Sequence, residues 1–165
     1  MPITTADIQY RLSGGASNND PLLSLGGVKS SVQSGTNLFD DVPSAEAAAG
    51  KIEYRCVYVH NAHATESYLD PVKIWIAANT PSTSTTIDIG LGTSGLNGTE
   101  QTVATESTAP VGVTFSAPSS FATGIAMQTI PAGQHIAVWI RRTITAGAAA
   151  FADSATLSIQ GDVNP

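Results

Sequence analysis

The chain is poor in charge and nearly free of cysteine. Its 165 residues include seven Lys and Arg against 13 Asp and Glu, so charged residues make up 12% where about 25% is usual. The net charge of −6 argues against binding to nucleic acid or anionic lipid, because both need a basic face. The single cysteine, Cys56, has no partner for an internal disulfide, and its strand-like neighbours predict a small buried hydrophobic residue rather than a reactive thiol.

Long hydrophobic runs are also missing. No run approaches the roughly 20 apolar residues of a membrane-spanning helix. The first residues have neither the basic nor the apolar segment of a secretory signal, so we expect a protein made in the cytoplasm that stays soluble until it meets its partner. Hydrophobic residues still account for 42% of the chain, which is enough for a domain with its own core and too many for a disordered chain.

Short segments with alternating hydrophobic residues are what the chain does contain. The clearest is 134–144, which places Ile136, Val138 and Ile140 on one face, together with Ile144. Further strands are predicted at 7–12, 54–61, 72–77, 86–91, 111–115 and 155–160. Polar turns separate these segments, and no segment after residue 51 has a helical repeat. The pattern predicts an all-β fold, an antiparallel two-sheet sandwich of immunoglobulin-like or jelly-roll type.

The first 50 residues differ from the rest. They hold one strand-like stretch, a run of turn-forming residues at 13–21, and a short Ala-rich piece with Ser44 available as N-cap and Gly50 as the residue after the helix. We therefore predict an extended N-terminal arm over 1–50 and a β-sandwich domain over 51–165. Because the arm has few apolar residues to bury, we expect it to pack along a neighbouring subunit.

A glycine-rich segment and three histidines are the candidates for chemistry. Residues 90–95 match the G-x-G-x-x-G pattern of dinucleotide sites, but turn-forming residues follow where a helix should begin, so we predict a loop. His60, His63 and His135 lack the supporting Cys or Glu cluster of a zinc site and are expected to hydrogen-bond to backbone. No nucleophile motif is present. We expect no metal, no cofactor and no enzymatic activity.

Two tryptophans and two arginines stand out within the predicted strands. Trp75 and Trp139 fall on the faces opposite the hydrophobic rows, where they could stack on sugars or meet a protein partner, and we favour an interface or cover by another part of the chain. Arg141 and Arg142 are adjacent and so point to opposite faces. We expect the inward-pointing one to pair with a carboxylate or lie at the edge of the core.

Several stretches together carry a family resemblance. They are DIQYRLSGGASN at 7–18 with SLGG at 24–27, EYRCVYVHN at 53–61 followed by VKIWI at 72–76, and IPAGQ at 130–134 leading to AVWIRR at 137–142. The chain in these stretches resembles small virion structural proteins of tailed bacteriophages. The resemblance implies a role class and no active site. Within that class the chain looks like a capsid decoration, or cement, protein.

This resemblance implies a protein that binds the outer shell, bridges neighbouring capsomers and stabilises the capsid. The implied partners are the major capsid protein and other copies of the chain, as a dimer or trimer, and the implied location is the virion surface after assembly in the host cytoplasm. The alternatives are a tail or baseplate component, or a carbohydrate-binding sandwich for host adsorption. The residues predicted to bind the partner are Ile8, Tyr10, Leu12, Leu22, Leu23, Leu25, Trp75 and Trp139.

Overall fold

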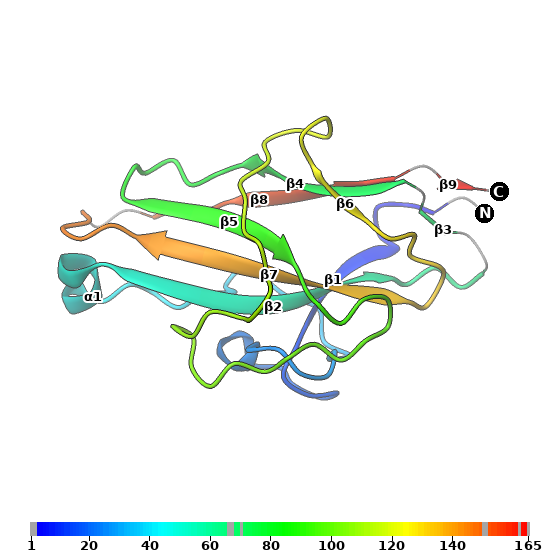
Figure 1. The fold of residues 1–165 in the computed structure, drawn as a ribbon, viewed down its shortest axis with the longest axis horizontal. Coiled ribbons are helices and arrows are strands. Elements are labelled where there is room, and N and C mark those ends of the chain that lie inside the picture. The colour runs from blue at the N-terminus through cyan, green and yellow to red at the C-terminus, as the bar shows by residue number, and fades with distance from the viewer. Residues whose placement is uncertain (1–2, 66–67, 70, 150–151, 162, 165) are drawn as a thin grey trace.

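Two antiparallel sheets form the body of the molecule in the computed structural model, which describes residues 3–65, 68–69, 71–149, 152–161 and 163–164 (Figure 1). The four-stranded sheet has the order β1-β2-β7-β5 and the three-stranded sheet the order β6-β4-β8, with a small pair β3-β9 beside them. The strands are β1 (Ile8–Leu12), β2 (Lys51–Asn61), β3 (Tyr68–Leu69), β4 (Val72–Ala78), β5 (Thr85–Leu91), β6 (Ile125–Met127), β7 (His135–Ile144), β8 (Thr156–Gln160) and β9 (Val163–Asn164). The predicted all-β sandwich is confirmed, while the choice between immunoglobulin-like and jelly-roll types stays open.

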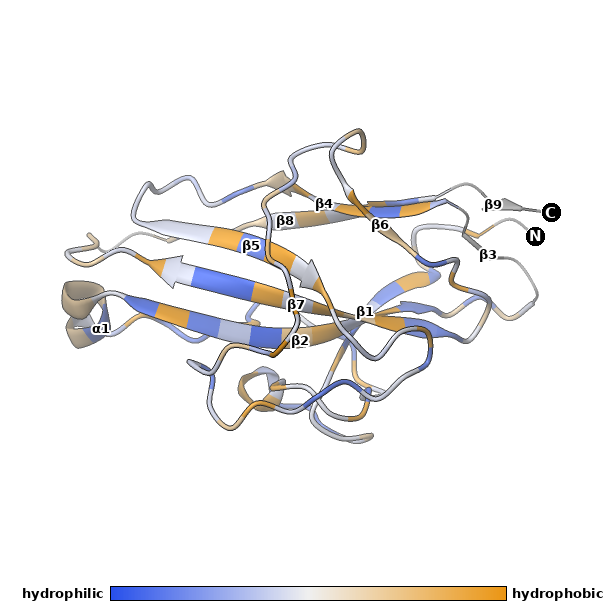
Figure 2. Ribbon diagram, viewed as in Figure 1, coloured by the Kyte–Doolittle hydropathy of each residue, from blue (hydrophilic) through white to orange (hydrophobic). Residues whose placement is uncertain are grey.

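The main core lies between the two sheets. Alternation along β7 places Ile136, Val138 and Ile140 in this core, as predicted, opposite the hydrophobic row of β4. Figure 2 shows the alternation as orange and blue bands along the strands. The longest pairing joins β2 to β7 from Lys51↔Ile144 to His60↔His135, so these two strands form the rigid centre of the molecule.

A second core lies on the outer face of the four-stranded sheet. Cys56 and Trp139 are fully buried there, with Tyr58 beside them. Loops from residues 13–34 and 92–116 cover this face, and the blue and green loops that lie below β2 in Figure 1 belong to them. We refer to these two segments together as the outer loop layer. The prediction that Cys56 is a buried hydrophobic residue is confirmed, and Trp139 is covered by the chain itself.

The predicted strand at 111–115 is wrong. Gly112 has a positive φ of 76°, which interrupts an extended strand, and Val111 is 80% exposed. Val113 and Phe115 instead pack down onto the outer core, and only Ser116 pairs with a strand, through a bridge to Ile89. A hydrophobic alternation therefore marks a loop that covers a sheet here, because covering residues must also point inward at intervals.

The N-terminal segment packs on its own sandwich, which corrects the prediction of an arm that lies along a neighbour. β1 is an edge strand of the four-stranded sheet, and its outer edge is itself paired, with Leu12 N donating to Val32 O at 3.0 Å. Cys56 N likewise donates to Ser24 O at 2.8 Å. Backbone hydrogen bonds and buried serines such as Ser13 attach this segment, so few apolar side chains are needed.

Two short helices complete the described structure. The 3₁₀ helix η1 (Pro21–Leu23) lies in the outer loop layer, and α1 (Ser44–Ala49) lies at one end of the sandwich. Ser44 is the first residue of α1 rather than its N-cap, which is Pro43, whereas Gly50 ends the helix at φ 76° as predicted. In the described part of the chain, neither helix has the length and hydrophobicity that crossing a membrane requires.

Candidate functional site

Only two of the eight residues predicted to bind a partner are exposed, and two are fully buried. Leu12 and Trp139 are 1% and 0% exposed, so the prediction that they contact a partner is wrong. Ile8 and Tyr10 pack against the core between the sheets, and Leu25 packs against the outer core. Ile8, Tyr10, Leu12 and Trp139 lie in segments with strand alternation. Alternation predicts which side chains share a face of a sheet, but it does not show what covers that face.

Leu22 and Leu23 are the predicted residues that are exposed, whereas Trp75, like Ile8, Tyr10 and Leu25, is half-buried. Trp75 is half-buried on the outer face of the three-stranded sheet, where its ring packs edge-on against Phe121 with 5.9 Å between centroids. Leu22 and Leu23 are 42% and 59% exposed at η1. Of the residues predicted to bind a partner, the dileucine turn at η1 is therefore the most exposed part.

The outer loop layer carries further exposed apolar residues besides the dileucine turn. Val28 and Val111 are also exposed on this layer. With Leu22 and Leu23 they make up what we term the outer loop surface. The two segments that carry it are joined by backbone hydrogen bonds from Val103 N to Leu25 O at 2.9 Å and from Gly27 N to Glu100 O at 3.1 Å. Large exposed hydrophobic residues gathered on one layer are typical of an interaction surface.

Local hydrogen bonds hold the dileucine turn in one conformation. The Asp20 carboxylate accepts from Leu22 N at 2.9 Å, and Ser24 N donates to Pro21 O at 3.0 Å, so both ends of η1 are satisfied. A surface that is ordered before binding loses less conformational entropy when a partner docks.

Tyr58 connects the outer loop layer to the sheet beneath it. Its hydroxyl donates to Gly27 O at 2.5 Å and accepts from Glu100 N at 2.9 Å, and so joins both loop segments to β2. Burial raises the pKa of the Tyr58 hydroxyl to about 12, so it stays protonated and keeps donating at neutral pH.

Gly26 permits the closest approach between the two loop segments. Its φ of +94° is disfavoured for side-chain-bearing residues, and a Cβ there would lie 1.8 Å from Gln101 O. We expect Gly26→Ala to lower the free energy of unfolding by about 2 kcal/mol or more, because it adds backbone strain to a steric clash. Urea denaturation measures the effect.

Gly35→Ala is the matched control for this substitution. Gly35 has no positive φ, and a Cβ there would meet nothing within 4 Å. The control should therefore change stability by less than about 0.5 kcal/mol. Equal stability of the two variants would contradict close packing of the outer loop layer.

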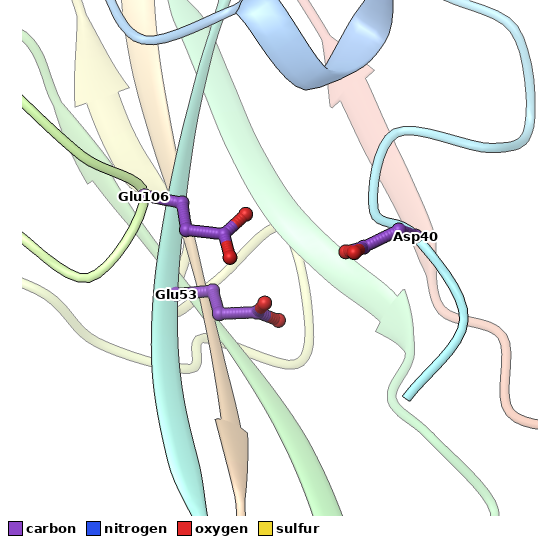
Figure 3. A group of neighbouring side chains, drawn as sticks. All are labelled: Asp40, Glu53 and Glu106. Atoms are coloured by element: carbon purple, nitrogen blue, oxygen red, sulfur yellow. The ribbon is translucent and has the colours of Figure 1, made fainter. Parts of the chain in front are cut away.

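A network of buried charges lies at the α1 end, between the sheets. Glu53, on β2, is fully buried and accepts from Arg142 Nε at 2.6 Å. Glu106 binds Arg55 at 2.6 Å and Lys51 at 2.5 Å. Figure 3 shows the carboxylates of Glu53, Glu106 and Asp40 turned toward the same space. The predicted pairing of the inward-pointing arginine is confirmed in Arg142.

This cluster does not fit a metal site. Carboxylate oxygens of Asp40, Glu53 and Glu106 lie within 4.8 Å of one another, which alone would suit a cation. Each is already paired, however: Glu106 as above, Glu53 also with Lys51 at 3.0 Å, and Asp40 with Arg142 at 3.3 Å. Three side-chain cations thus already lie in ion pairs with these carboxylates, with Lys51 also bound to Glu46 at 2.6 Å, and a metal ion would have to displace them.

The electrostatics of Glu106 agree with a stabilising network. Hydrogen bonding from Lys51, assisted by Arg55, lowers the pKa of the Glu106 carboxyl to about 2, against an opposing effect of burial. Because the folded pKa lies below the usual value near 4.3, this carboxylate stabilises the fold above about pH 4.3 and loses that contribution as the pH falls toward 2.

A broad pocket of about 1380 Å³ opens beside this network, between the sheets. Its lining includes Phe39, Ile140 and Leu157 together with Arg142, whose guanidinium lies 4.7 Å from the Phe39 ring centroid. Among the described residues that line it there is no histidine or cysteine, so its serine and threonine hydroxyls lack an adjacent imidazole base.

The glycine-rich loop and two of the histidines behave as predicted. Gly90 and Leu91 are the last residues of β5, whereas residues 92–99 form a loop and turns with no helix, and the Glu100 carboxylate accepts from Ser94 N at 3.0 Å. His60 Nδ1 lies 3.2 Å from Gln134 O, and His63 Nδ1 accepts from Thr65 N at 3.2 Å. These contacts are structural.

Comparison of the chain with protein-family models, with curated proteins and with solved structures found no match.

Proposed function

We propose that this protein is a structural component of a tailed-bacteriophage virion, a decoration protein that binds the outside of the capsid and bridges neighbouring capsomers. The observation that carries the proposal is the outer loop surface, four exposed apolar residues on a loop layer that is hydrogen-bonded to the four-stranded sheet. Low charge density and the net charge of −6 also suit an outer surface that must not adhere to nucleic acid.

In this proposal the N-terminal segment does not extend to a neighbouring subunit but forms part of the docking surface. It forms one side of the outer loop layer and presents Leu22 and Leu23 to the major capsid protein. Copies related by a local two-fold or three-fold axis would present the same surface at each junction, as a dimer or trimer. Binding to the assembled shell rather than its separated parts stabilises the shell by mass action.

The double substitution Leu22→Ser and Leu23→Ser tests the docking surface. We expect it to weaken binding about tenfold to capsids of the encoding phage assembled without the protein, because two half-exposed leucines lose apolar contact. The measurement is co-sedimentation with capsids over a concentration series. The parent protein should bind saturably, with a copy number commensurate with the capsid lattice.

Phe121→Ser is the matched control, since Phe121 is 37% exposed but lies against Trp75 on the outer face of the other sheet. Loss of binding in Phe121→Ser with retention in the dileucine variant would contradict the proposed surface. A handful of copies per virion would instead favour a tail or baseplate component. Glycan binding that disappears in Trp75→Ala would favour host adsorption.

A further inference from the structure

The cations of this chain divide into two groups. Lys51, Arg55, Arg141 and Arg142 each lie in an ion pair with a carboxylate. Among the described residues, Arg11, Lys29 and Lys73 have no such pair, and Lys73 lies apart from the other two, over the Phe121 ring on the three-stranded sheet. In an acidic protein with only seven Lys and Arg, cations left without carboxylates are a distinctive feature of the surface.

Strand register brings Arg11 next to two histidines. In the β1–β2 pair, Arg11 lies opposite Tyr58 and Gln9 lies opposite His60, so Arg11 and His60 point to the outer face of the four-stranded sheet. His60 lies opposite His135 of β7, with 6.4 Å between the ring centroids. Three basic side chains thus come from three neighbouring strands to one end of one face.

Lys29 comes to the same place from the outer loop layer. Its chain neighbours are held on both sides, because Tyr58 donates to Gly27 O and Ser30 N donates to Leu12 O at 2.8 Å. These two bonds hold the Lys29 backbone beside Leu12 and Tyr58, at the end of the outer face that carries Arg11 and His60, and the Lys29 charge acts on His60 and His135. All four basic side chains are half-buried, so they are partly removed from water yet reachable from it.

The groups around this cluster leave its positive charge unbalanced. Arg11 donates to the neutral oxygens of Ser31 and Gln9, and His135 Nδ1 is buried with no hydrogen-bond partner. The nearby carboxylates have other partners. Glu100 accepts from Ser94 N at 3.0 Å and Thr93 Oγ1 at 3.1 Å, and Asp7, whose field reaches His63, accepts from Thr4 N at 2.7 Å.

Burial and repulsion between neighbouring positive charges both lower the pKa values of Lys29, His60 and His135 in this cluster. Burial, aided by the charges of Lys29 and Arg11, lowers the pKa of His60, and burial aided by Lys29 and His60 lowers the pKa of His135 to about 4. Burial followed by repulsion from Arg11 lowers the pKa of Lys29. A bound anion would favour the protonated forms of these groups and so raise their pKa values.

We propose that Arg11, Lys29, His60 and His135 form a binding site for a free inorganic tetrahedral oxyanion, of the sulfate or phosphate class. The Arg11 guanidinium and the Lys29 ammonium supply permanent charge, and the two imidazoles donate hydrogen bonds when protonated. This site lies beside the proposed docking surface but does not depend on the proposed function.

The proposed site has a defined dependence on pH. A bound anion favours the protonated imidazoles and so raises the pKa of His60 and that of His135, which is about 4 without the anion. Lowering the pH from 8 toward 5 makes this coupled protonation easier, so binding should strengthen; the reverse holds as pH rises. The other groups facing the cluster, Tyr58 and Glu100, keep their protonation states over this range because each is held in the hydrogen bonds described above. Sulfate is the better probe, since its own charge stays constant over this range.

The experiment follows the imidazole NMR signals of the full chain during titration with sodium sulfate at pH 6, with sodium chloride at matched ionic strength as reference. We expect saturable shifts of His60 and His135 and a raised midpoint for their proton titration. Lys29→Gln should weaken sulfate binding at least about tenfold, since one charge-assisted contact is lost.

Lys73→Gln is the matched control, because Lys73 also lacks a described carboxylate partner but lies over the Phe121 ring on the other sheet, 4.9 Å from its centroid. Its affinity for sulfate should equal that of the parent protein. Shifts that fail to saturate or that chloride reproduces would overturn the site, as would equal weakening by Lys29→Gln and Lys73→Gln.

Discussion

Replacing Trp139 with alanine is expected to lower the free energy of unfolding by about 3–5 kcal/mol, the usual range for removal of a buried aromatic ring. The indole is fully buried on the outer face of the four-stranded sheet. Its cross-strand neighbours are Cys56 on β2 and Gly90 on β5, two small residues that leave room for it. Val113 packs over the same cluster, so truncation would leave a cavity between sheet and loop.

Trp75→Ala removes the same side chain from a half-buried position and is the control for this prediction. Its ring is packed mainly against Phe121, so the loss should be roughly 1–2 kcal/mol. Guanidinium denaturation monitored by circular dichroism compares the two variants. A Trp139→Ala protein as stable as Trp75→Ala would mean that the outer loop layer does not cover the sheet in solution.

The sequence predicts the sheets better than it predicts what covers them. Alternation along β7 identifies Ile136 and Val138 as core and puts Trp139 on the opposite face, all of which the structure confirms. It contains no signal for a loop layer over that opposite face, because loops have no fixed period. The small residues Cys56 and Gly90 are consistent with space for a large side chain beside them. Only the strand register shows that they flank the Trp139 indole.

The N-terminal segment illustrates a different limit. Its attachment depends on backbone hydrogen bonds and on fully buried hydroxyl side chains, such as Ser13, whose Oγ donates to Cys56 O at 2.8 Å. Serine in a run of turn-forming residues gives no hydrophobic signal, so composition alone suggests an arm that needs a neighbour. Whether a chain segment buries itself is decided by long-range pairing that one sequence does not display.

The ion network was partly visible in the sequence. The sequence predicts that the inward-pointing one of Arg141 and Arg142 pairs with a carboxylate or lies at the edge of the core, and the structure identifies it as Arg142, paired with Glu53. Lys51, Glu53 and Arg55 alternate on the same face of β2 as the buried Val57 and Val59, so the pattern of charges at every second position could have marked an inward-facing charged row. What the sequence could not show is that Glu106, far along the chain, completes it.

Removing the central carboxylate of that network is the second large effect we expect. Glu53→Gln should lower the free energy of unfolding by about 3 kcal/mol, because it leaves the buried Arg142 guanidinium without its closest carboxylate and Lys51 with one fewer. Glu53 is fully buried, so water cannot replace the lost partner. Urea denaturation at pH 7 measures the loss.

Asp88→Asn is the matched control, since Asp88 pairs with Arg141 at 2.8 Å in an ion pair that is partly open to water. Because solvent screens that pair, its removal should cost no more than about 1 kcal/mol. A Glu53→Gln protein no less stable than Asp88→Asn would contradict a buried network. The two pairs use neighbouring arginines of β7 on opposite faces, so their difference isolates burial as the reason that one carboxylate matters more than the other.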